Sequence, residues 1–101
     1  MAMLKYKAIR DNIPVDKKEL VRFSDELFLI LMEEKLQEEL KEYDSSKDVS
    51  ELGDIIEVCC RIAELRGVNN NQLEAMISSK NLEKGRFAFN NVWIRKDETT
   101  I

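Results

Sequence analysis

Acidic residues occur in this sequence at spacings that would place them in pairs on one face of an α-helix. Glu39 and Glu42 are three residues apart, and Glu51 and Asp54 repeat that spacing nine residues later. Residues three or four apart lie on one helix face, so Glu38 joins the first pair. If the two helices pack together, up to five carboxylates converge. Two of them about 4 Å apart repel by roughly 4 kcal/mol at an effective dielectric of about 20, so such a cluster needs water, protons or a hard cation such as Mg²⁺.

A helical projection favours the cation over open water. Over residues 24–43, at about 100° per residue, the three glutamates of the first segment fall inside the apolar arc. In the second segment Glu51 lies inside a broad apolar arc, and Asp54 lies at its edge. The alternative is an acidic helix surface in contact with water, which is the usual meaning of a glutamate-rich segment. Because these acids continue apolar stripes, we expect them to point into the contact between two helices.

The residue types that the chain lacks, or has in few copies, exclude several kinds of metal and catalytic site. The chain contains no histidine, which excludes histidine-based zinc sites, Ser-His and Cys-His catalysis, and the Glu-x-x-His motif of di-iron bundles. The only cysteines, Cys59 and Cys60, are adjacent and would diverge by about 100° on a helix, so they cannot form a thiolate cage. Oxygen ligands remain, and these indicate Mg²⁺, with Mn²⁺ as a possible substitute.

The order of the acidic residues resembles a known signature. The pattern E-E-x-x-E followed by E-x-x-D is similar to the metal-binding motif of the all-α nucleoside triphosphate pyrophosphohydrolases, the MazG-like proteins. Three further pieces resemble a small MazG-like branch of bacteria and phages. Residues 5–14 are similar to its K-L-V-R-D-K-I-P start, Lys35-Leu36 precedes the acids as in that branch, and residues 84–87 are similar to its R-G-x-F. The pieces span roughly residues 4–94, in the family's order.

The resemblance implies a reaction and roles for the acids. The expected activity is Mg²⁺-dependent hydrolysis of a nucleoside triphosphate to a nucleoside monophosphate and pyrophosphate. Glu39, Glu42, Glu51 and Asp54 would hold one or more Mg²⁺ ions. Glu38 would orient or deprotonate the attacking water, or serve as a further ligand.

Cations near the end of the chain are candidates for binding the phosphates. Lys80 and Lys84 lie on the same helical stripe as the apolar Leu73, and Arg86 follows closely. We expect the two lysines to hold the phosphate tail, with Arg86 as a weaker candidate. The alternative is structural, because lysines near a helix C-terminus complement its dipole and pack their apolar stems. Lys84 stands where the branch usually has arginine, so a point charge replaces a bidentate fork.

The composition predicts one all-α domain over residues 1–101. Three glycines and one proline leave few breaks, which favours long helices. The capping signals predict helices over 24–43, from about 48 to 67, and over 71–85, with short strands at 4–8 and 87–94 as the only β structure. So few helices cannot enclose a deep core, and we expect a helical bundle completed as a homodimer or homotetramer.

The remaining expectations concern partners and location. The net charge of −4 does not indicate nucleic-acid binding. There is no apolar run of about 20 residues, so we expect no membrane partner and a cytoplasmic location. In the lead-in, Arg10 and Asp11 either form a structural ion pair or reach the site.

Two other functions compete with the general pyrophosphohydrolase. The first is phosphoribosyl-ATP pyrophosphohydrolase, which belongs to histidine synthesis. The second is a non-catalytic helical protein that binds nucleotides or other proteins and keeps the acids only as a Mg²⁺ staple.

Overall fold

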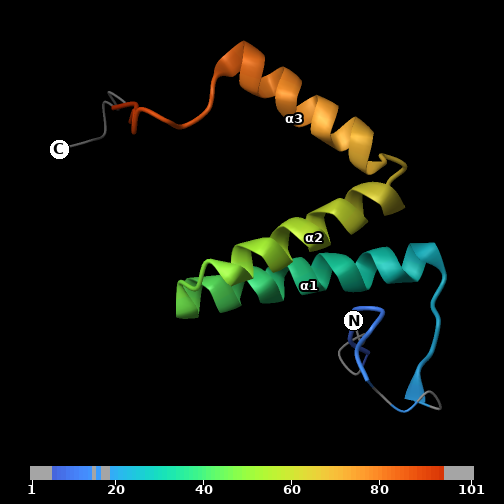
Figure 1. The fold of residues 1–101 in the computed structure, drawn as a ribbon. Coiled ribbons are helices and arrows are strands. Elements are labelled where there is room, and N and C mark those ends of the chain that lie inside the picture. Colours follow the sequence, from blue (N-terminus) through green and yellow to red (C-terminus); the bar gives the residue numbers. More distant parts are fainter. Residues whose placement is uncertain (1–5, 15, 17–18, 95–101) are drawn as a thin grey trace, which may run out of the picture.

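The structure is a computed structural model that describes residues 6–14, 16 and 19–94. In this part of the chain the regular elements are three helices, α1 (Asp25–Ser46), α2 (Ser50–Leu65) and α3 (Asn70–Lys84), as Figure 1 shows. The all-α class is therefore confirmed. The strand predicted over 87–94 is wrong, because these residues form only a turn and then an irregular, exposed segment. A lone hairpin is marginal in water, and the exposed aromatic side chains find no apolar surface to pack on within the described part of the chain. Of the other predicted strand, residues 4 and 5 lie outside the described residues, and 6–8 are irregular.

Helix α1 begins where its cap predicts and ends later than expected. The Ser24 hydroxyl oxygen accepts a hydrogen bond from the Leu27 backbone N–H at 3.3 Å. The predicted end at Tyr43 is wrong by three residues. The chain leaves the helix only at Lys47, which adopts the left-handed conformation (φ 55°) and donates its N–H to the Tyr43 carbonyl at 2.7 Å. This cap satisfies a carbonyl at the helix end, so the polar residues before it remain helical.

Helix α2 begins at Ser50, and its N-cap residue, Val49, makes no side-chain cap; the preceding Asp48 has a different hydrogen-bond partner from the one its spacing suggests. The predicted capping box joined Asp48 to Glu51. Instead, the Asp48 carboxylate accepts from the Ser50 backbone N–H at 3.0 Å and from the Ser50 hydroxyl at 2.9 Å. These hydrogen bonds stabilise the anion and lower the pKa of Asp48. The helix ends at Leu65, and the chain turns away at Gly67, where φ is 89°.

Helix α3 starts before the predicted position. The expected cap was Asn71 with Glu74, but the observed capping box uses Asn69 and Gln72. Each side-chain oxygen accepts from the backbone N–H of the other residue, at 2.9 Å for Asn69 and 2.8 Å for Gln72. Each of the three consecutive asparagines could cap the helix. Asn69 does so because the side chain of Gln72, three residues later, accepts a hydrogen bond from its backbone N–H in return.

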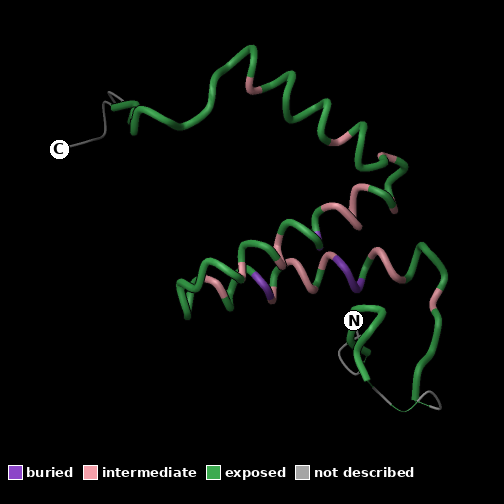
Figure 2. The backbone as a smooth tube through the Cα atoms, viewed as in Figure 1, coloured by how far each residue is buried: buried purple, intermediate pink, exposed green. Residues whose placement is uncertain are grey.

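The α1–α2 pair is the scaffold of the site. The two helices lie antiparallel and side by side, whereas α3 contacts α2 but no residue of α1 within the described chain (Figure 1). Among the described residues, the few that are buried belong to α1, α2 and the N-terminal segment (Figure 2). Their hydrophobic members are Ala8, Leu31, Met32 and Val58. The radius of gyration is 18.1 Å, against about 13 Å for a compact domain of about 100 residues, so the single chain is open.

None of the helices in the described part of the chain has both the length and the hydropathy needed to cross a membrane.

Candidate metal centre

The predicted carboxylates converge where the middle of α1 faces the start of α2. Glu39 has an oxygen within 4.8 Å of oxygens of Glu38 and Glu42, and it forms a second group of the same size with Glu51 and Asp54. Glu39 therefore belongs to both groups. The helical spacing brings each pair onto one face, and the packing of α1 against α2 brings the two pairs together.

Glu39 is the one buried polar residue among those described, and its environment is incomplete. Its side chain is only 8% exposed, and Oε1 lies 3.5 Å from the Lys35 ammonium on the previous helical turn. The other oxygen, Oε2, is buried without a hydrogen-bond partner. A buried acceptor without a partner costs about 1–3 kcal/mol, and more when it is charged. Carboxylates on a surface are common without a metal, but this buried oxygen has the surroundings that a hard cation would complete.

Two cations from the N-terminal segment reach the same carboxylates. Arg10 Nη2 lies 2.8 Å from Asp54 Oδ1, and Lys7 Nζ lies 3.3 Å from Glu38 Oε1. Of the two alternatives for Arg10, the structure favours the second, because its ion pair is with Asp54 of the carboxylate cluster. The sequence did not indicate a role for Lys7, because Lys7 and Glu38 are 31 positions apart and come together only through the fold.

Packing holds the N-terminal segment in place beside the acids. Ala8 is buried in the core with Leu31 and Met32, and the Tyr6 ring meets Phe23 edge to face with centroids 5.1 Å apart. The backbone on both sides of Lys7 is therefore anchored, while the charged end of that side chain remains exposed.

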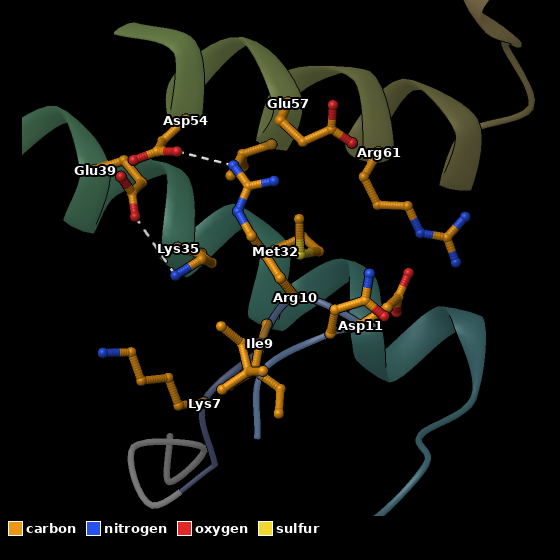
Figure 3. A pocket seen from close by; sticks show the side chains of 14 residues that line it. Lys7, Ile9, Arg10, Asp11, Met32, Lys35, Glu39, Asp54, Glu57 and Arg61 are labelled. Carbon is orange, nitrogen blue, oxygen red and sulfur yellow. Dashed lines mark hydrogen bonds and ion pairs between the residues drawn. The ribbon is translucent and has the colours of Figure 1, made fainter. Parts of the chain in front are cut away.

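A cavity of about 620 Å³ lies between this segment and the α1–α2 pair (Figure 3). Four cationic side chains line it: Lys7, Arg10, Lys35 and Arg61. Four carboxylates complete its charged lining: Asp11, Glu39, Asp54 and Glu57. The lining is thus formally neutral, and one divalent cation would give it a net charge of +2. The cavity is large enough for a group of the dimensions of a nucleotide's phosphate tail, and a bound cation would supply the positive charge that such a polyanion requires.

The repulsion among the clustered carboxylates affects the pKa of Glu51. Partial burial, followed by the negative charges of Glu42, Glu39, Asp54 and Asp48, raises the pKa of Glu51 above its ordinary value of 4.5. Mutual repulsion of this kind is what a bound cation relieves.

This raised pKa predicts a pH dependence of the metal-free protein. The folded state binds a proton at Glu51 more tightly than the unfolded state, so this group's contribution to stability falls as the pH rises from about 4.5 through the raised folded value. With a chelator present, we expect Glu51→Gln to unfold at about the same temperature as the native protein at about pH 4, and at a higher temperature than the native protein at about pH 7. Thermal unfolding at both pH values measures this. A variant that is less stable than the native protein at about pH 7 would contradict it.

The cations of the C-terminal region lie elsewhere in the single chain. Lys80 and Lys84 are exposed on α3, which does not contact α1, and Arg86 lines a separate cavity of about 320 Å³ with exposed aromatic residues. The stripe that we expected to face a core is open here, with Met76 59% exposed. The described fold thus brings together the five predicted carboxylates, but not the three predicted phosphate-binding residues.

Comparison of the chain with protein-family models, with curated proteins and with solved structures finds no match. What the fold and site define is a helical protein with a partly buried carboxylate cluster beside a cationic segment.

Proposed function

We propose that this chain is a Mg²⁺-dependent nucleoside triphosphate pyrophosphohydrolase of the MazG-like kind. The observation that carries the proposal is Glu39, a buried carboxylate with an unpartnered oxygen at the meeting point of two carboxylate groups. The resemblance of the acidic motif supplies the reaction, and the cavity beside the motif is of a size that can accept a phosphate tail.

The donors fit a hard cation. The proposed ligands, Glu39, Glu42, Glu51 and Asp54, offer only oxygen atoms, which Mg²⁺ and Mn²⁺ prefer. Because Glu39 belongs to both groups, it would contribute a ligand oxygen to an ion held by either of them. When bound, Mg²⁺ would supply charge compensation at the phosphate oxygens and a lowered pKa for water.

Glu38 is the proposed general base. Its side chain is 43% exposed, so water reaches it, and the Lys7 ammonium now pairs with it. Glu38 would orient one water molecule and take its proton as the water oxygen forms a bond to phosphorus. The bond between that phosphorus and the oxygen bridging the α- and β-phosphates breaks, which leaves a nucleoside monophosphate and pyrophosphate.

We also propose that the protein works as a homodimer or homotetramer in the cytoplasm. The support is the open single chain, in which large apolar side chains of α2, α3 and the following segment are more than half exposed. They include Ile56, Met76, Ile77, Leu82, Phe87 and Trp93. In such an assembly, α3 of another copy is one route by which Lys80 and Lys84 could approach the carboxylates.

The assembly leads to a prediction about mass. Light scattering should give two or four times the 11.8 kDa of one chain. Ile56→Asp combined with Met76→Asp places charges on apolar surface that the assembly would bury, so we expect this variant to shift towards the mass of a single chain. The control Ser78→Asp changes an exposed polar position on α3 and should leave the mass unchanged. A native mass of one chain would contradict the prediction.

The experiment that tests the function is a pyrophosphate-release screen. It would compare Mg²⁺ with a chelator over normal and modified nucleoside triphosphates, with phosphoribosyl-ATP as a separate arm. Mg²⁺-dependent release from a nucleoside triphosphate supports the proposal, and release from phosphoribosyl-ATP alone supports the histidine-synthesis alternative. If none of these compounds released pyrophosphate, the proposed hydrolase function would be overturned.

The non-catalytic alternative has one observation in its favour. Lys7, Arg10 and Lys35 already neutralise three of the carboxylates, as they would in a purely structural network. In that case Mg²⁺ would raise the melting temperature while every nucleotide remained intact.

A further inference from the structure

The N-terminal segment places cations on two acids of the proposed site, the metal ligand Asp54 and the general base Glu38. The Arg10 guanidinium is 2.8 Å from Asp54 and the Lys7 ammonium is 3.3 Å from Glu38. A divalent cation held by Asp54 and the other proposed ligands would compete directly with Arg10 and would repel the nearby Lys7 ammonium. Metal binding and these two ion pairs therefore oppose each other.

Both side chains are free to turn to another partner. The Arg10 side chain is 57% exposed and that of Lys7 is 67% exposed, so neither ion pair is locked in by packing. The backbone between them is held by the buried Ala8, which keeps both cations beside the cavity when their partners change. In Figure 3 the Arg10 side chain extends between the Asp54 carboxylate and the side of the cavity formed by the N-terminal segment.

We infer that Arg10, assisted by Lys7, exchanges partners: it neutralises Asp54 in the metal-free protein and binds the phosphate tail of the nucleotide once a divalent cation holds the carboxylates. The inference rests on the proposed function and deepens it. It assigns the phosphate tail to the N-terminal segment of the same chain rather than to Lys80 and Lys84. The planar guanidinium suits this role, because it can donate two parallel hydrogen bonds to a phosphate group.

The test measures two affinities of the full chain by calorimetry, first for Mg²⁺ alone and then for the magnesium complex of tripolyphosphate, a probe that carries no base. We expect Arg10→Ala to bind Mg²⁺ about two- to fivefold more tightly, because the competing ion pair is gone. The same variant should bind magnesium tripolyphosphate about tenfold more weakly. A damaged fold would weaken both, so the opposite signs identify the exchange. Arg10→Lys keeps the charge but loses the fork, and should restore part of the tripolyphosphate affinity.

Arg66 offers a closely matched control. It pairs with Glu33 at 2.6 Å between α2 and α1, its side chain is 58% exposed, and it does not line the cavity. Arg66→Ala should therefore leave both affinities unchanged.

Four outcomes would overturn the inference. If Arg10→Ala binds magnesium tripolyphosphate as tightly as the native protein, or loses both affinities together, the exchange is wrong. If only a Lys80→Ala and Lys84→Ala double variant loses tripolyphosphate affinity while the native protein releases pyrophosphate, the exchange fails and the proposed function stands. If the native protein does not bind Mg²⁺, both fail.

Discussion

Glu39→Gln is expected to abolish Mg²⁺-dependent pyrophosphate release, lowering it by about 100-fold or more. Replacing residues that only support a metal ligand typically costs about 10- to 100-fold, so the loss of a central ligand should cost at least as much. Glu39 is the common member of both carboxylate groups, so its replacement removes a ligand from each. Glutamine retains the shape of the side chain but not its charge. Mg²⁺ should raise the melting temperature of the native protein, because binding stabilises the folded state by about 2.7 kcal/mol when the Mg²⁺ concentration is about 100 times the dissociation constant. The Glu39→Gln variant should lose this rise.

The control for this prediction is Glu33→Gln, on the same helix. Glu33 pairs with Arg66 and belongs to neither carboxylate group, so both the activity and the response to Mg²⁺ should persist. If native protein and Glu39→Gln were equally inert on every nucleotide, while Mg²⁺ still raised the native melting temperature, the staple interpretation would hold. A Glu39→Gln variant with full activity would exclude Glu39 as an essential ligand.

The second large effect is expected in the small core that positions the acids. Leu31→Ala should lower the free energy of unfolding by about 2–5 kcal/mol, the usual cost of truncating a buried leucine. Leu31 is 5% exposed and packs with the few other buried residues, among them Val58 of α2 and Ala8 of the N-terminal segment. Chemical denaturation measures the change.

The matched control is Val21→Ala, which truncates a side chain that is 68% exposed and should change stability by no more than about 0.5 kcal/mol. A loss below about 1 kcal/mol for Leu31→Ala, outside the usual range for a buried leucine, would mean that α1 and α2 are not held together through this contact. Such a loss would also remove the reason for the two carboxylate pairs to meet.

Local pattern was enough to predict the helices and the carboxylate cluster. Ser24 and Gly67 mark helix ends through their own chemistry, one by accepting a backbone hydrogen bond and the other by tolerating a positive φ. The positions of Glu39 and Asp54 relative to the apolar stripes depend on helical periodicity alone. Where local signals competed, the predictions were wrong by a few residues, as at the caps of α2 and α3.

The sequence by itself determined which residues share a helix face, because that geometry is set by the neighbouring turns of one helix. Only the tertiary structure decided that Arg10 meets Asp54, that Lys7 meets Glu38, and that α3 leaves the α1–α2 pair without touching α1. These arrangements depend on loop directions and on the burial of a single small residue, Ala8, which leave no periodic trace in the sequence. The cationic side of the site therefore came from the fold, whereas its acidic side was already encoded in the spacing of the carboxylates.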